Sequence, residues 1–131
     1  MDNMPKILLV DDELPALNAL RRVLNKGNFK VLSTTNPDEA LTILKTNKVD
    51  MIICDHQMPV LFGIEVLKQA RDLAPDAVRI LITGSSDLSM AIQALREGII
   101  YHYFAKPWEN NELAEIVHKG LKEKNLKGVV Q

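Results

Sequence analysis

Cysteine is nearly absent from this chain of 131 residues, in which Cys54 stands alone. One cysteine cannot form an internal disulfide, and no group of cysteines and histidines has the paired spacing of a zinc site. These absences exclude the small secreted scaffolds that disulfides or structural zinc hold together. A chain of this length buries about two thirds of its unfolded surface, which is enough for a core without cross-links. We expect Cys54 to lie in that core because it ends an apolar run.

Long apolar runs are missing as well. The longest, residues 7–10 and 51–54, have four residues each, whereas a membrane span needs about 20. Residues 1–5 also lack the basic-then-apolar order of a signal peptide. We therefore expect a cytoplasmic protein that makes no membrane contact.

Neither sign of charge is in excess. Lysine and arginine together number 16, and aspartate and glutamate number 17. This balance provides no basic face for a phosphate backbone, so we expect no direct nucleic-acid contact.

Short apolar runs alternate with helical patterns along the chain. The runs that predict strands are residues 7–10, 31–34, 51–54, 79–83 and 100–105. Apolar residues at three- and four-residue spacing predict helices over residues about 14–24, 37–47, 64–73, 87–98 and 111–122. Five strands alternating with five helices indicate a doubly wound α/β fold with a parallel sheet. The flavodoxin-like strand order 2-1-3-4-5 is the common arrangement of five such strands.

Two of these helices are preceded by residues that suit a helix N-terminus. Asn36 is expected to cap one of them, with Pro37 in the first helical position and Glu39 completing a capping box. Ser86 or Asp87 is expected to cap another. The apolar residues of that second helix are Met90, Ile92 and Leu95.

Polar residues stand where four of the predicted strands end. They are Asp11, Asp12, Asp55, Thr83 and Lys106. The carboxyl ends of parallel strands share one edge of the sheet, where ligands of this fold bind. Three carboxylates there would repel one another unless a cation intervened, and hard oxygen ligands suit Mg²⁺. With a lysine and a hydroxyl opposite the metal, the pocket suits phosphoryl transfer, with Asp55 as the nucleophile that becomes an acyl phosphate.

The sequence at these strand ends resembles the receiver domain of two-component response regulators over residues about 6–122. The four motifs that carry the resemblance are residues 10–13, 55–59 with Gly63, 82–84 and 103–107. The resemblance implies that Asp55 is the phospho-acceptor and that Lys106 assists the transfer. It also implies that Asp12 and Asp55 bind Mg²⁺ directly, that Asp11 binds it through water, and that the backbone carbonyl of Gln57 completes the ligands.

The resemblance further implies a switch. Thr83 would be drawn toward the phosphorylated aspartate, and the ring of Tyr103 would occupy the space it leaves. The surface of the fourth helix, the fifth strand and the fifth helix would then change shape. Gln57 and Ser85 match the positions that tune hydrolysis of the acyl phosphate. The residues expected on or near the switching surface are Met90, Ile99, Tyr101 and Tyr103.

The partners implied are a sensor histidine kinase or a histidine phosphotransfer protein, together with an output domain or protein that the sequence does not identify. A homodimer through the switching surface is also expected. We expect a receiver domain over residues 4–124 and a short tail, 125–131, that could begin a linker. Whether the chain is a single-domain regulator or the first part of a longer protein stays open.

Two other classes of function compete with this interpretation: a flavin-binding protein or a phosphatase on the same fold, and a docking module. A flavin-binding protein would place a phosphate loop after the first strand, where residues 11–13 are acidic and would repel the phosphate. A phosphatase that uses an aspartate nucleophile would need a cap domain, for which the chain is too short. A docking module that is not phosphorylated would be expected to lack one of Asp12, Asp55, Thr83 or Lys106, and all four are present. We therefore expect a signalling phospho-acceptor that catalyses only its own phosphotransfer and autodephosphorylation.

Two aromatic residues near these motifs have simpler explanations. His56 is expected to point outward, and Trp108 is expected to pack at the start of the last helix, with an alternative role in binding.

Overall fold

The computed structural model describes residues 4–130, and the side chains of residues 4–124. Its strands are β1 (Lys6–Val10), β2 (Lys30–Thr34), β3 (Met51–Asp55), β4 (Val78–Thr83) and β5 (His102–Ala105). They pair in parallel in the order β2-β1-β3-β4-β5. The predicted doubly wound, flavodoxin-like α/β fold is confirmed.

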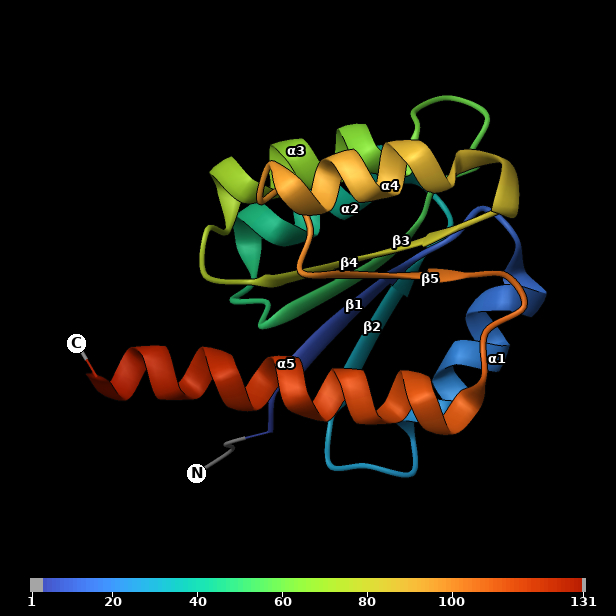
Figure 1. Ribbon diagram of the computed structural model, residues 1–131. Helices are drawn as coiled ribbons and strands as arrows, with labels where there is room; N and C mark the ends of the chain where they lie inside the picture. Colours follow the sequence, from blue (N-terminus) through green and yellow to red (C-terminus); the bar gives the residue numbers. More distant parts are fainter. Residues whose placement is uncertain (1–3, 131) are drawn as a thin grey trace.

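Helices cover both faces of this sheet. They are α1 (Leu14–Leu24), α2 (Pro37–Thr46), α3 (Gly63–Leu73), α4 (Leu88–Arg96) and α5 (Asn110–Val130), with a short 3-10 turn, η1 (Ser85–Asp87), before α4. Helices α2, α3 and α4 lie on one face, and α1 and α5 lie on the other (Figure 1). Apolar runs form the strands because a sheet covered on both faces buries every side chain of its central strands.

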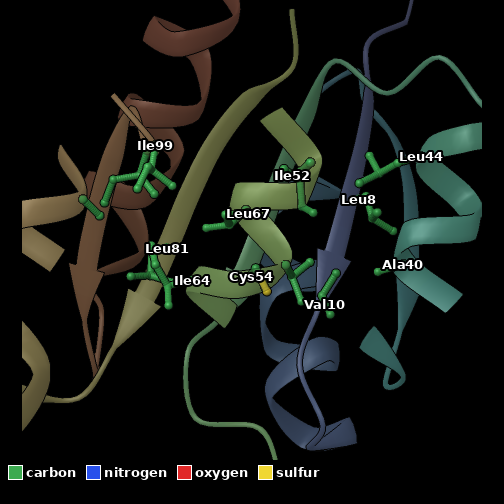
Figure 2. Packing of buried hydrophobic residues seen from close by; sticks show 14 of the residues in the cluster. Leu8, Val10, Ala40, Leu44, Ile52, Cys54, Ile64, Leu67, Leu81 and Ile99 are labelled. Atoms are coloured by element: carbon green, nitrogen blue, oxygen red, sulfur yellow. The ribbon is translucent and has the colours of Figure 1, made fainter. Parts of the chain in front are cut away.

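The alternation of side chains along each strand divides the core into two layers. Leu8, Ile52 and Leu81 pack beneath α2, α3 and α4, as Figure 2 shows, in a layer that also contains Cys54. Leu9 and its equivalents on the other strands pack against α1 and α5. Cys54 is fully buried, as predicted.

The start of α2 follows the sequence prediction in part. Asn36 Oδ1 accepts hydrogen bonds from the backbone N–H groups of Asp38 at 2.8 Å and Glu39 at 3.4 Å, so Asn36 is the predicted cap. The predicted capping box is wrong, because the N–H of Asn36 donates to Thr34 Oγ1 at 3.1 Å instead. Thr34 ends β2 two residues earlier, so its hydroxyl already satisfies the N–H that Glu39 was expected to bind.

Helix α4 places small residues against the sheet and larger ones toward solvent. Ala91 and Ala94 are buried, whereas Ile92 is 39% exposed and Leu95 is 41% exposed. Ile99, expected on or near the switching surface, lies between α4 and β5 and is buried, at 4% exposure. Gly98, at a φ of 73° that favours glycine, turns the chain after α4, and Ile99 then enters the core.

Helix α5 runs to Val130, well past the predicted end at Lys122. Gly120 lies within this helix, at a point where the helix crosses the sheet closely. A Cβ atom on Gly120 would lie 3.2 Å from side-chain atoms of Met51 and Tyr101. The predicted tail begins within this helix at residue 125, and its side chains lie outside the described residues.

No helix in the described part of the chain combines the length and the apolar character needed to cross a membrane.

Candidate functional site

The predicted site residues meet at one edge of the sheet because the parallel strands end there. Val10, at the end of β1, is paired with Cys54 of β3, so Asp11 and Asp55 follow at the same level. On the far side of β3, Asp55 is paired with Ile82, one residue before Thr83. The N–H of Lys106, just beyond β5, donates to the backbone carbonyl of Thr83 at 2.9 Å. Four residues that are distant in sequence, Asp11, Asp55, Thr83 and Lys106, thus converge.

Three carboxylates form an acidic cluster at this edge. One oxygen each from Asp11, Asp12 and Asp55 lies within 4.8 Å of the others. Asp11 and Asp55 are only 1% and 3% exposed. Asp11 Oδ1 accepts the N–H of Glu13 at 2.9 Å, but Asp11 Oδ2 and Asp12 Oδ1 are buried without a hydrogen-bond partner. Unpaired buried carboxylate oxygens are costly, so this cluster fits a divalent cation that takes oxygen ligands.

Lys106 supplies a positive charge to the cluster. Its Nζ lies 2.7 Å from Asp55 Oδ1 and 3.6 Å from Asp11 Oδ2. Partial burial of the ammonium group opposes its charge, but the hydrogen bond to Asp55 and the field of Asp11 together raise the pKa of Lys106 above its ordinary value. Lys106 therefore carries a full positive charge beside the Asp55 carboxylate at neutral pH.

The carboxylates are harder to ionise than ordinary aspartates. The pKa of Asp11 is raised to about 6. Burial is the largest cause and the charge of Asp55 adds to it, while the hydrogen bond from Glu13 acts in the opposite direction. Burial also raises the pKa of Asp55, and the hydrogen bond and charge of Lys106 offset this only in part. One lysine does not neutralise three carboxylates, so the site favours a second cation.

We expect Mg²⁺ to stabilise the fold more at pH 7.5 than at pH 5. The folded-state pKa of Asp11, about 6, lies above its ordinary value of 3.8. The folded chain therefore holds the proton more tightly, and the stability from Asp11 is full below pH 3.8 and lost as the pH rises through about 6. This loss is on the order of 3 kcal/mol without metal, and a bound cation would recover it.

Urea unfolding at both pH values, with Mg²⁺ or with EDTA, measures this difference. Asp11→Asn should reduce the difference in Mg²⁺ stabilisation between pH 7.5 and pH 5, because the amide does not ionise. An Mg²⁺ effect of equal size at the two pH values would contradict the prediction.

The backbone of Asp55 is packed against the start of α3. A Cβ atom on Gly63 would lie 2.1 Å from the carbonyl oxygen of Asp55 and 2.8 Å from the Cα of His56. Only glycine allows this approach, which explains why Gly63 accompanies the motif of residues 55–59. The loop from residue 56 to residue 62 is thereby closed tightly onto the end of β3.

His56 is buried, so the predicted outward orientation is wrong. Its side chain is 6% exposed, its Nδ1 accepts the N–H of Ile64 at 3.4 Å, and its ring stacks on Phe62 with centroids 5.1 Å apart. The backbone N–H of His56 also donates to the carbonyl of Ile82 at 2.9 Å, which continues the β3–β4 pairing past Asp55. This pairing turns the side chain toward the first turn of α3.

Thr83 and Tyr103 share the face of the sheet that α4 covers. Leu81 is paired with Tyr103, and Thr83 lies two residues beyond Leu81, so alternation places all three on one face. Thr83 is fully buried, and its hydroxyl donates to the carbonyl of Gly84 at 3.3 Å. Tyr103 is half-buried against the core layer beneath α4. Their roles in a switch stay a prediction.

The two residues predicted to tune hydrolysis follow the ends of β3 and β4, Gln57 in a loop and Ser85 at the start of η1. Both Gln57 and Ser85 are exposed. Gln57 Nε2 donates to Asp87 Oδ2 at 2.7 Å, so its side chain reaches across to the segment before α4. Asp87 was not among the predicted site residues.

Comparison with known proteins decides the family. The profile described as response regulator receiver domain matches residues 7–118. The chain belongs to the response regulator receiver family. The matched residues include the acidic cluster, Asp55 and Lys106.

Individual relatives of this receiver domain include regulators of several sizes. It is 39% identical over 127 residues to the hydrogenase transcriptional regulatory protein HoxA of Cupriavidus necator, which covers 97% of this chain and 26% of HoxA. It is 31% identical over 116 residues to sporulation initiation phosphotransferase F of Bacillus subtilis, covering 88% of this chain and 93% of that protein. A response regulator receiver domain protein from Clostridium thermocellum superposes with a TM-score of 0.86 at 31% identity, covering 94% and 98% of the two chains.

A surface pocket beside the receiver site escaped the sequence analysis. It has a volume of about 510 Å³ and is lined by Ala16, Lys106, Pro107, Trp108 and Asn110. Trp108 packs against the core layer under α5, as predicted, and its Nε1 donates to Asn110 Oδ1 at 3.1 Å. The Lys106–Pro107 peptide bond is cis. The contribution of α1 to this pocket is a tertiary feature, because residue 16 and residue 108 are far apart in sequence.

Proposed function

We propose that this receiver domain accepts a phosphoryl group on Asp55 from a histidine kinase or a histidine phosphotransfer protein in a step that depends on Mg²⁺. The observation that carries the proposal is the 2.7 Å contact between Lys106 Nζ and Asp55 Oδ1, beside two buried carboxylate oxygens that lack partners. The site thus combines a nucleophile, a fixed positive charge and ligands for a metal.

In this proposal Asp12, Asp55 and the backbone carbonyl of Gln57 hold Mg²⁺ directly, and Asp11 holds it through water. The cation supplies positive charge that stabilises the phosphoryl oxygens during transfer. A carboxylate oxygen of Asp55 bonds to phosphorus, while the bond from phosphorus to the donor nitrogen breaks and the donor keeps the electron pair. Lys106 offsets the negative charge on the moving group, and the Thr83 hydroxyl donates to one of its oxygens.

The same residues support a change of surface after transfer. The Thr83 hydroxyl moves inward, Tyr103 follows, and the surface formed by α4, β5 and α5 presents a different shape to its partner. Ile92 and Leu95 are already exposed on α4, which suits an apolar contact with an output partner or with a second copy of the chain. Autodephosphorylation, tuned by Gln57 and Ser85, returns the domain to its starting state.

The place of this domain in a larger protein follows by analogy with its relatives. The chain spans about a quarter of the length of HoxA, 26%, and a similar share of the other regulators of that kind that it matches. We propose that residues 4–124 form a cytoplasmic receiver unit whose phosphorylation controls a separate output domain or partner.

Intact-protein mass spectrometry after incubation with acetyl phosphate tests the phosphoryl transfer. We expect a mass increase of one phosphoryl group with Mg²⁺, and none with EDTA or in Asp55→Ala. Asp76→Ala is the matched control, because Asp76 is an exposed aspartate after α3 that should leave the increase intact. If beryllofluoride, a stable mimic of the phosphoryl group, also fails to alter the Tyr103 and Trp108 environments, a docking module without phosphorylation replaces this proposal.

A further inference from the structure

The hydrogen bond between Gln57 and Asp87 links two segments that are 30 residues apart in sequence. Gln57 lies in the loop that follows the acceptor Asp55, and Asp87 is the last residue of η1, directly before α4. The Nε2 to Oδ2 distance is 2.7 Å, short for an amide donor because the acceptor is a carboxylate. The acceptor loop is thus tied directly to the start of the helix that borders the switching surface.

Asp87 occupies the N-cap position of α4 but does not cap it, so the capping predicted from the sequence is wrong for this residue. Its side chain accepts no hydrogen bond from the first turn of the helix. Its ψ of 19° explains this, because a capping residue has an extended backbone. The 3-10 turn, closed by the N–H of Asp87 donating to the carbonyl of Gly84 at 3.1 Å, maintains that conformation.

The carboxylate of Asp87 therefore has two alternative sets of donors. In the structure it accepts from the Gln57 amide, and after the 3-10 turn opened it could accept from the N–H groups of Ser89 and Met90 in the first turn of α4. An exposed hydrogen bond to a carboxylate and a helix cap are of similar strength. A modest change in the position of Gln57 or of the first turn of α4 is therefore enough for Asp87 to replace one hydrogen bond with the other.

We propose that Asp87 is a positioning residue that alternates between holding Gln57 and capping α4. The turn that must open begins directly after Thr83 and Gly84, so inward movement of Thr83 and capping by Asp87 involve the same residues. A phosphoryl group on Asp55 adds oxygen acceptors next to the Gln57 loop, and these compete with Asp87 for the Gln57 amide. This last step rests on the proposed function. The alternation of Asp87 between Gln57 and the first turn of α4 does not.

Hydrogen exchange of the Ser89 and Met90 amides, measured by NMR, tests whether Asp87 changes its hydrogen-bond partner without any phosphoryl group. Gln57→Ala frees the carboxylate, so we expect about five-fold slower exchange at these two amides than in the unaltered protein. Asp87→Ala should show no slowing, and the double variant should behave like Asp87→Ala. Gln93→Ala is the matched control, because Gln93 Nε2 makes a similar 2.7 Å bond to Glu97 on the same helix.

Unchanged exchange in Gln57→Ala, or slowing that persists in the double variant, would overturn the proposal. Addition of beryllofluoride with Mg²⁺ is the second test. It should slow hydrogen exchange at the same two amides in the unaltered protein but not in Asp87→Ala. Slowing by beryllofluoride in Asp87→Ala would also overturn it. If beryllofluoride does not bind at all, the proposed phosphorylation fails, while the slowing in Gln57→Ala still supports the exchange of Asp87 between partners.

Discussion

Lys106→Ala is expected to lower the rate at which Asp55 gains a phosphoryl group by about 100-fold. Lys106 Nζ is 2.7 Å from Asp55 Oδ1, so its charge is already in place before the negative phosphoryl group arrives. Removal of one preorganised charge or donor of this kind lowers the rate by about 100-fold to 1000-fold. Without the lysine, the pKa of Asp55 should also rise further, because burial would then act with less opposition.

The rate is measured by mass spectrometry during a time course with acetyl phosphate and Mg²⁺. Lys45→Ala removes an exposed lysine of α2 and should leave the rate unchanged. Carbon-13 NMR of the Asp55 carboxyl during a pH titration follows the pKa separately. A Lys106→Ala rate within three-fold of the starting protein would show that the contact does not assist transfer.

Gly63→Ala is expected to lower the free energy of unfolding by about 3 kcal/mol. The added Cβ would overlap the carbonyl oxygen of Asp55, at 2.1 Å, and this is backbone rather than a flexible side chain. Relief requires α3 or the end of β3 to move, and both hold buried residues of the same core layer. Because the moved carbonyl belongs to the acceptor itself, phosphorylation should fall along with stability.

Urea unfolding with a matched glycine separates this overlap from the general effect of replacing glycine. Gly84→Ala is that control, since a Cβ atom there would meet no heavy atom within 4 Å. It should change the free energy of unfolding by less than about 0.5 kcal/mol. Equal losses in the two variants would mean that Gly63 is not required for the close approach of α3.

Much of the site was predictable because it follows from strand ends. Apolar runs indicate parallel strands, and parallel strands place their carboxyl ends on one edge. Asp11, Asp55 and Lys106 each follow such a run, so their convergence needed no knowledge of side-chain packing. The hydrogen bond of Asn36 at the start of α2 was predictable for a similar reason, since donor and acceptor are two or three residues apart.

Choices between competing partners were not predictable. Asp87 had helix N–H groups within reach in the sequence, yet its carboxylate binds Gln57, which is 30 residues away. The N–H of Asn36 binds Thr34 instead of Glu39. In each case two partners of similar strength were available, and the path of the backbone decided which one lay closer.

The sequence by itself determined the order of strands and helices, the buried strands and the set of polar residues at the strand ends, because these depend on periodicity and on local chemistry. Only the tertiary structure decided that His56 turns inward, that Ile92 and Leu95 face solvent while Ile99 is buried, and that Trp108 borders a pocket with α1. The physical reason is that a helix or loop can satisfy its own pattern in several orientations. The packing of the sheet, with Gly63 and Gly120 at its closest approaches, selects one of them.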